Sequence, residues 1–215
     1  MIKHIAHHAL VLWVVSVSML GGGGQAQAAD LFYDFDAGEQ GFVVTGGSIS
    51  VAAGHLALHD TDNAEMTAWL PQADLGDWRR FLGGALSFDA INLNGFATDW
   101  LSFGTLRIES ADRVIERDLV LPAAPSAQWT TYTLALNEQT LGPDLASLMG
   151  AVTRVGLVLE SHIGFDASNG GAEVNGLDNL RVTAAVPEPH GWLMLLSGVV
   201  AVGAGVHRRR PARSA

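Results

Sequence analysis

The chain has 215 residues, with 22 acidic residues against 12 lysines and arginines, which gives a formal net charge of −10. A surface of this sign repels phosphate, so nucleic acid and anionic lipid headgroups are excluded as main partners. The sequence contains no cysteine, so the fold depends on its apolar core or on a bound metal rather than on disulfides.

The first 28 residues are predicted to be a secretory signal peptide. Lys3 gives a weakly basic start, residues 9–20 form an apolar run of the usual length, and glycines then break that run. Ala26 and Ala28 form the small-x-small pattern of a cleavage site, so we expect cleavage after Ala28 and export by the general secretory route. An uncleaved N-terminal anchor is the alternative.

Residues 29–185 are predicted to form one all-β domain, long enough to bury a core of ordinary size. All acids except Glu188 lie in this region, which therefore has 21 acids against seven arginines and a net charge near −14. Short apolar runs bounded by glycine, proline, asparagine and aspartate are typical of a β-sandwich or barrel. One short helix is expected at 143–149. Strands are expected at 31–36, 42–44, 48–52, 54–59, 65–70, 85–93, 100–103, 105–109, 113–121, 129–136, 152–159 and 174–182.

Four motifs follow one another in this domain. They are 69–71 (Trp-Leu-Pro), 81–89 (Phe-Leu-Gly-Gly-Ala-Leu-Ser-Phe-Asp), 129–136 (Trp-Thr-Thr-Tyr-Thr-Leu-Ala-Leu) and 176–182 (Gly-Leu-Asp-Asn-Leu-Arg-Val). In this order they resemble the laminin B domain, also called laminin domain IV. The chain departs from that family in a small insertion at 73–78 and in lacking the EGF-like neighbours of laminins. The resemblance implies a jelly-roll β-sandwich of the carbohydrate-binding-module type, and the departures put laminin-type partners in doubt, not the sandwich.

The same resemblance implies a structural calcium site. Jelly rolls of this type often hold the ion between the turn after the first strand and the last strand, and calcium takes about six to eight oxygen ligands. The ligands expected from this placement are Asp34, Asp36, Glu39 and Asp178. The alternative is that these acids are solvated turn residues, with Asp178 capping a strand.

Two further groups contain residue types that can bind metal ions. Residues 60–65 contain two aspartates, an asparagine and a glutamate, but the spacing of a full calcium loop is missing, so a polar turn is favoured over calcium. His55 and His59 would lie about 13 Å apart on a strand, which is too far for one ion.

Exposed aromatic residues are the candidates for contact with a glycan. Trp78 and Trp100 lie in loop-like stretches and are expected to stack on a sugar, the alternative being that they cover the ends of the sandwich. Trp129 and Tyr132 have opposite parity on one strand, so only one of them can face inward. We expect the inward residue to be Trp129.

The sequence carries no catalytic signature of a nucleophile elbow, zinc protease, P-loop or dinucleotide site. Two acids distant in sequence could meet as a glycosidase pair, but in a chain with this many acids such a pair would arise by chance. The domain is therefore expected to be non-catalytic.

The last segment, residues 186–215, has three parts. They are the triplet Pro187, Glu188 and Pro189, a hydrophobic helix predicted over 191–206, and a basic tail over 207–213 with Arg208, Arg209 and Arg210. The prolines end the preceding domain because each lacks an N–H donor and has a fixed φ. At about 1.5 Å per residue the helix is slightly short for a bilayer core of about 30 Å, and the arginines would stay cytoplasmic.

These three parts, in this order, resemble the PEP-CTERM sorting signal of Gram-negative bacteria. The resemblance implies recognition by an exosortase-type transpeptidase at the inner membrane, cleavage near the Pro-Glu-Pro triplet, and release or attachment at the cell surface. Proteins of that class commonly accompany exopolysaccharide and biofilm. A permanent membrane anchor is the alternative.

Taken together, the sequence predicts a non-catalytic exported protein of the cell surface or extracellular matrix, associated with exopolysaccharide or biofilm. A carbohydrate-binding module for matrix polysaccharide is the alternative, followed by a glycoside hydrolase.

Overall fold

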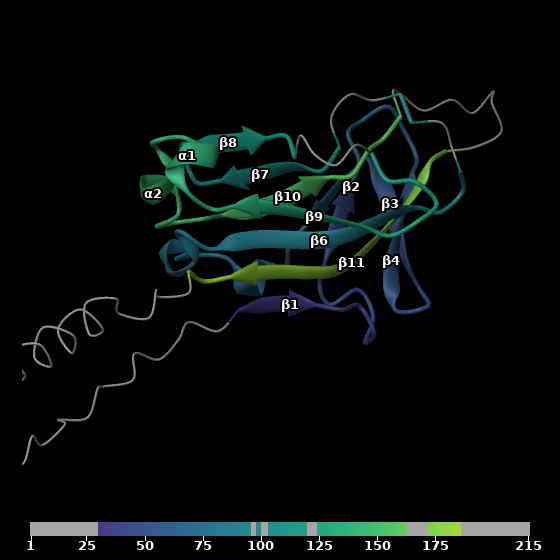
Figure 1. Cartoon of the computed structure of the whole chain (residues 1–215), viewed down its shortest axis with the longest axis horizontal. Helices are drawn as coiled ribbons and strands as arrows, with labels where there is room; N and C mark the ends of the chain where they lie inside the picture. Colours follow the sequence, from purple (N-terminus) through teal and green to yellow (C-terminus); the bar gives the residue numbers. More distant parts are fainter. Residues whose placement is uncertain (1–29, 96–97, 100–102, 120–123, 163–171, 186–215) are drawn as a thin grey trace, which may run out of the picture.

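The domain is a sandwich of two antiparallel β-sheets (Figure 1). The structure is a computed structural model, and it describes residues 30–95, 98–99, 103–119, 124–162 and 172–185. The predicted signal peptide and C-terminal segment lie outside these residues. Within the described part, no helix has the length and apolar character needed to span a bilayer. The predicted all-β sandwich is confirmed.

The first sheet, called sheet A, is built around its longest strand, β11 (Val174–Thr183). Its strand order is β3 (Gly47–Ala52), β4 (His55–Asp60), β11, β6 (Ala85–Asn92) and β9 (Thr130–Ala135). One edge of β11 pairs first with β4 and then with β1 (Leu31–Tyr33), while the other edge pairs with β6. β11 is therefore a central strand that is hydrogen-bonded along both edges.

The ladder between β11 and β6 contains a β-bulge. Asp178 pairs with Asp89, whereas the next pair is Arg181 with Ser87. Asn179, inside the bulge, has a φ of 50°, in the left-handed region that asparagine tolerates better than most residues. The bulge brings the Asn179 amide to Asp89, where Nδ2 donates to Oδ2 at 3.0 Å.

The second sheet, called sheet B, has five strands. Their order is β2 (Val43–Thr45), β5 (Thr67–Trp69), β10 (Arg154–Val158), β7 (Thr105–Glu109) and β8 (Val114–Arg117). All neighbours are antiparallel. Two 3₁₀ turns, η1 (Gln72–Asp74) and η2 (Arg79–Phe81), connect β5 of this sheet to β6 of sheet A.

Two short α-helices, α1 (Glu138–Leu141) and α2 (Leu145–Leu148), connect β9 to β10. The second agrees with the helix predicted at 143–149. The first was not predicted, because four residues show no helical period and α1 lacks the starting proline that marks the second helix. Its start is fixed locally, since the Asn137 side chain accepts a hydrogen bond from the backbone N–H of Thr140 at 2.9 Å.

The apolar core between the sheets follows from strict alternation along the strands. In β6, Leu86, Phe88 and Ala90 are buried, and the residues between them face outward. Phe88 stacks on Tyr132 of β9, with ring centroids 5.2 Å apart. Each fully buried large side chain contributes about 1.5–3 kcal/mol. The core therefore determines which side chains form the two outer faces.

The expectation for Trp129 is wrong. Tyr132 is fully buried, whereas Trp129 is 44% exposed. Tyr132 and Leu134 share the inward side of β9, and Trp129, three residues before Tyr132, has the opposite parity. The alternation of inward and outward residues was predicted correctly, but the inward set was assigned to the wrong residues. Either aromatic ring can fill a core, so the sequence did not show which one does.

Candidate functional site

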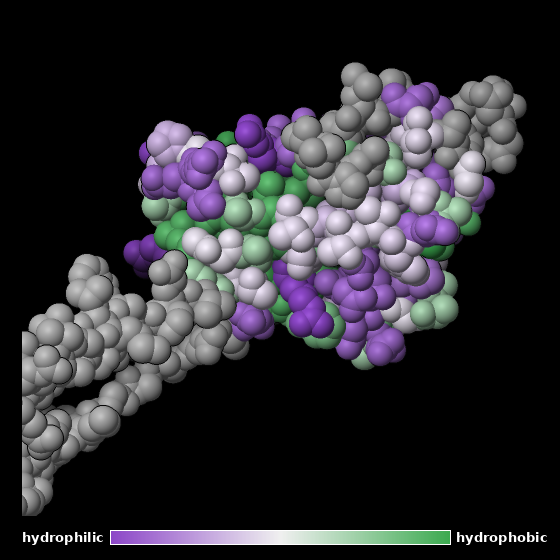
Figure 2. Space-filling view, in the orientation of Figure 1, coloured by the Kyte–Doolittle hydropathy of each residue, from purple (hydrophilic) through white to green (hydrophobic). Residues whose placement is uncertain are grey.

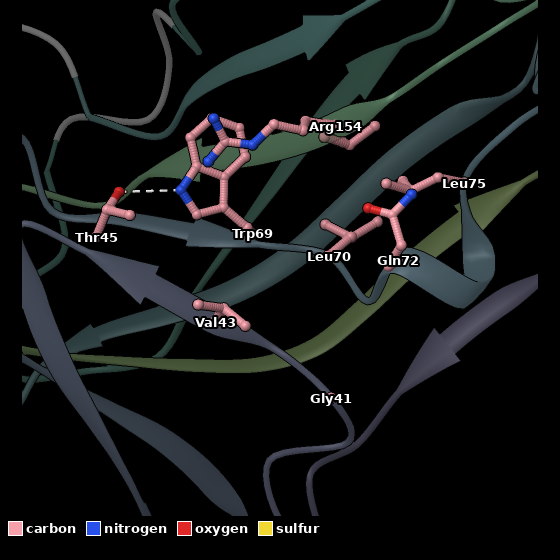
Figure 3. Close-up of a pocket in the computed structure, with 9 residues that line it drawn as sticks. Gly41, Val43, Thr45, Trp69, Leu70, Gln72, Leu75 and Arg154 are labelled. Carbon is pink, nitrogen blue, oxygen red and sulfur yellow. Dashed lines mark hydrogen bonds between the residues drawn. The ribbon is translucent and has the colours of Figure 1, made fainter.

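A hollow of about 290 Å³ lies on the outer face of sheet B (Figure 3). Strands β2, β5 and β10 form it together with the chain that follows β5. Its lining residues are Gly41, Val43, Thr45, Trp69, Leu70, Gln72, Leu75, Arg154 and Val155. None of these described residues is acidic, so Arg154 gives the hollow a positive charge in an otherwise acidic domain.

Trp69 is the central side chain of the hollow. Its strand pairs with β2 on one edge and β10 on the other, so the indole has neighbours on both sides. The ring covers Gly156, where an added Cβ would lie 2.6 Å from Trp69 Cε3. Toward β2, Trp69 Nε1 donates a hydrogen bond to Thr45 Oγ1 at 2.9 Å. The indole is therefore held in one orientation, and only a glycine fits beneath it.

Arg154 stacks on this indole, with Cζ 3.5 Å from a ring centroid (Figure 3). The cation–π contact leaves Trp69 8% exposed. The side chain of Arg154 itself stays 46% exposed, and its Nη1 lies 3.7 Å from Glu109 Oε2, which is longer than a hydrogen bond. Arg154 therefore presents the outer face and edge of a planar guanidinium to the hollow.

A row of charged side chains continues from Arg154 across sheet B. Arg107 Nε donates to Glu109 Oε1 at 2.7 Å, and Arg107 Nη1 lies 3.0 Å from Glu116 Oε1. Such partly exposed pairs each contribute about 1 kcal/mol or less to stability. They still order the side chains next to the hollow, so planar donors and carboxylate acceptors lie beside one aromatic ring.

This arrangement can bind a polyhydroxylated ligand. A planar indole–guanidinium stack can pack against the C–H face of a sugar ring, and Val43, which is 61% exposed, adds an apolar edge. Thr45 and Gln72 bring a hydroxyl and an amide to the rim. Among the described residues, the lining has no carboxylate or imidazole to act as a general acid or base.

The predicted calcium ligands do not come together as a metal site. Those residues are Asp34, Asp36, Glu39 and Asp178. Asp34 Oδ1 accepts hydrogen bonds from Gln40 Nε2 at 2.9 Å and from the backbone N–H of Asp36 at 3.3 Å, so it closes the turn after β1. In the part of the chain that the structure describes, no three acidic or histidine side chains are placed to share a metal ion. The turn interpretation therefore fits Asp34.

The polar segment 60–65 forms a turn, which is the interpretation that its residue spacing favoured over a calcium loop. Asp60 Oδ1 accepts the backbone N–H of Asp62 at 3.2 Å, and Asp62 Oδ1 accepts that of Ala64 at 2.7 Å. Nearby on β4, His59 Nε2 lies 3.1 Å from Ser50 Oγ of β3. These side chains are occupied in closing the β4 end of sheet A.

The prediction that Trp78 contacts a glycan is wrong. The side chain is fully buried, and its Nε1 donates to the backbone carbonyl of Asp74 at 2.8 Å. Its ring packs edge-on against Phe81, with centroids 5.2 Å apart. The segment lacks a periodic pattern because it runs through two 3₁₀ turns, which tuck the indole into the core. Trp100, the other predicted contact, lies outside the described residues.

The burial of three acids was not predicted from the sequence. Asp60, Glu160 and Glu173 are all buried. Burial, with the neighbouring carboxylates adding to it, raises the pKa of Glu160 to about 7. Burial also raises the pKa of Glu173 and that of Asp60. Glu160 and Glu173 accept backbone N–H groups of Met66 and Ser161, at 3.0 and 2.9 Å. The sequence around an acid at the end of a strand does not indicate whether its side chain is buried.

Comparison with solved structures finds the same type of fold. Part of an exo-β-agarase matches with a TM-score of 0.51 and 14% identity over 72% of this chain, which spans 25% of that protein. A variant of the family 29 carbohydrate-binding module CBM29-2 matches with a TM-score of 0.45 and 18% identity over 75% of this chain and 99% of the module. Another variant, complexed with cellulohexaose, has a TM-score of 0.45 and 17% identity over 75% of this chain and 99% of the module.

At these identities the likeness concerns the fold alone. No protein-family model and no curated protein matches the chain. The predicted β-sandwich is confirmed, whereas the laminin B resemblance and the sorting signal stay predictions.

Proposed function

We propose that this is a non-catalytic, exported carbohydrate-binding protein, and that the hollow on sheet B holds a polysaccharide chain. The observation that carries this proposal is the Trp69–Arg154 stack, locked over Gly156 inside an open hollow. The fold likeness to part of an exo-β-agarase agrees with a polysaccharide ligand. The cation in the hollow also fits an acidic or hydroxyl-rich chain better than a basic one.

In this proposal a sugar ring packs between Val43 and the stacked guanidinium of Arg154. The N–H groups of Arg154 donate to sugar hydroxyl or carboxylate oxygens. Gln72 and Thr45 supply further donors and acceptors at the rim. Because the indole is already fixed by its bond to Thr45, it loses little conformational freedom on binding.

A binding experiment with the full-length chain tests this function. Affinity electrophoresis would screen soluble cellulose derivatives, agarose and alginate, and calorimetry would then measure the best ligand. We expect Trp69→Ala and Arg154→Ala each to weaken binding about tenfold or more, which is about 1.4 kcal/mol. Arg113→Ala is the matched control, because that arginine is similarly exposed but directly precedes β8, away from the hollow.

Two results would overturn the proposal. One is the absence of binding to every polysaccharide by the wild-type protein. The other is unchanged binding by Arg154→Ala, a surface change that preserves the fold even if Trp69→Ala does not. Release of new reducing ends from a bound polysaccharide would favour the glycoside hydrolase instead.

The proposed route to the surface uses both ends of the chain. Residues 1–28 direct export, and 186–215 present the Pro-Glu-Pro segment to an exosortase-type enzyme. The mass of the mature protein recovered from cells reports both cleavages. A double variant, Pro187→Ala with Glu188→Ala, is expected to keep its arginine tail, whereas a wild-type protein that also keeps the tail would indicate a permanent anchor.

A further inference from the structure

A second tryptophan lies on the opposite face of the sandwich and is not covered. Trp129, directly before β9, is 44% exposed. Its indole reaches across sheet A, since an added Cβ on Gly176 of β11 would lie 3.1 Å from Trp129 Cη2. The ring also meets His55 of β4 edge-on, with centroids 5.3 Å apart. One side chain therefore forms an aromatic surface over several strands.

Two carboxylates lie next along this face. Asp178 of β11 is directly opposite Asp89 of β6. Asn179 Nδ2 joins them, donating to Asp89 Oδ2 at 3.0 Å and to Asp178 Oδ2 at 3.3 Å, and Thr131 Oγ1 donates to Asp89 Oδ1 at 2.6 Å. Residues two apart on a strand are about 7 Å apart on the same face. Gly176 and Asp178 have this spacing, so the carboxylates begin about one sugar ring away from the indole.

The carboxylate pair has no arginine or lysine bound to it among the described ion pairs. Arg181 is on the neighbouring stretch of β11 but stacks on Phe32 of β1, with Cζ 3.9 Å from the ring centroid. Like charges directly opposite on two strands are unfavourable. A cation bound between Asp89 and Asp178 would relieve that repulsion.

The same geometry shifts the pKa of Asp178. Burial raises its pKa, and the charges of Asp89 and Asp36 add to the increase, whereas the backbone N–H of Asn179 and the charge of His55 oppose it. His55 is thus the basic side chain that faces the pair from β4. Figure 2 shows the surface over β6 and β11 as pale to hydrophilic.

We propose that this face of sheet A is a second glycan-binding site, which takes a chain of amino sugars with free amines. Trp129 stacks one ring, and the ammonium group of the adjoining sugar donates to the carboxylates of Asp89 and Asp178 from the solvent side. An N-acetylated chain has the same shape without the charge, so it binds more weakly. The site is independent of the hollow on sheet B, whose cation favours the opposite charge.

The test uses the full-length chain and chitosan oligosaccharides of one length, fully deacetylated or fully N-acetylated, with calorimetry at two salt concentrations. We expect Trp129→Ala to weaken binding of the deacetylated chain about tenfold. Asp89→Asn with Asp178→Asn should weaken the same binding about tenfold, but leave the acetylated chain unaffected. Asp112→Asn with Asp144→Asn removes two acids elsewhere on the surface, and controls for general attraction of a polycation to an acidic protein.

Equal affinity for the two chains, or unchanged binding by Trp129→Ala, would overturn the proposal. A dimer in sedimentation that disappears in Trp129→Ala would also overturn it, because the face would then belong to a second copy. Arg154→Ala should leave binding of the deacetylated chain unchanged. Failure at one face therefore does not count against the other.

Discussion

Each outer face of the sandwich places a tryptophan over a glycine, yet the two faces differ in chemistry. On sheet B, Trp69 covers Gly156 and is itself covered by Arg154. On sheet A, Trp129 reaches Gly176 and stays open beside an aspartate pair. The same residue type is a rigid support for a cation in one place and an exposed contact surface in the other.

The position of each strand in its sheet explains this difference. β5 has hydrogen-bonded neighbours on both edges, so Trp69 can be fixed by Thr45 on one side and by Arg154 on the other. β9 is the outermost strand of sheet A, and Trp129 precedes it, so fewer side chains are available to cover the ring. The number of neighbouring side chains, rather than residue identity, therefore decides whether each indole is covered or exposed.

The largest expected effect comes from a substitution of the buried Glu160. This change should leave ligand binding at both outer faces unaltered. The folded pKa of Glu160 is about 7 against an ordinary value of 4.5, so wild-type stability is greatest below the ordinary value and falls as the pH rises through about 7. Glu160→Gln removes this loss and should be more stable at pH 8 by about 3 kcal/mol. Urea unfolding at pH 5 and pH 8 measures the difference. A gain that is equal at both pH values would contradict this assignment.

The second effect compares the two glycines. Gly156→Ala places a Cβ against the immobilised Trp69 ring and should lower the free energy of unfolding by about 2 kcal/mol, with weaker binding at the hollow. Gly176→Ala must displace Ile91 Cγ2, 2.6 Å away, but Trp129 can swing outward. Its cost should be about 1 kcal/mol. Thermal unfolding of both variants checks the order, and a reversed order would mean that Ile91 and Trp129 together yield less than the Trp69 ring.

A third effect distinguishes the faces by pH. Because its pKa is raised, Asp178 is protonated at a higher pH than an ordinary aspartate, so amino-sugar binding on sheet A should fall as the pH is lowered toward 4 through the acidic range in which the sugar amines are already protonated. The loss should reach about tenfold, since the site then loses a negative charge. The described lining of the hollow contains no carboxylate or imidazole. Calorimetry across this range should therefore show a steady affinity at the hollow. Equal losses of affinity at both faces would contradict the assignment of the pH effect to Asp178.

The smallest effect concerns the shape of the cation in the hollow. Arg154→Lys keeps the charge but loses the planar group that stacks on Trp69. We expect about a threefold weaker polysaccharide affinity, less than for Arg154→Ala, and no change at sheet A. If lysine restores full affinity, charge alone is what the ligand recognises.

The sandwich itself was predictable because alternation along strands such as β6 reports which residues share a face. The pairing of strands was not, since β4 and β1 share one edge of β11 through contacts distant in sequence. Trp78 was misplaced for a related reason. Irregular chain is often exposed, but here two 3₁₀ turns bury its ring.

The candidate sites were less predictable than the fold. The sequence places Trp69 in the Trp-Leu-Pro motif, but its setting in the hollow depends on Gly156 and Arg154, which lie far away in the sequence and come from β10. The buried Glu160 looks like any other acid of an acidic chain. Only three-dimensional neighbours separate an acid that caps a turn, such as Asp34, from one held inside the protein.

The pairing of β1 with β11 has a mechanical consequence. Both ends of the domain leave from one corner, where the backbone N–H of Ala184 donates to Asp30 Oδ1 at 3.1 Å (Figure 1). A pull on residue 185 loads β11, which must break hydrogen-bond ladders on both edges before it moves. A pull on residue 30 only peels away β1, a strand of 3 residues. The sandwich therefore resists force from its C-terminal side far better than from its N-terminal side.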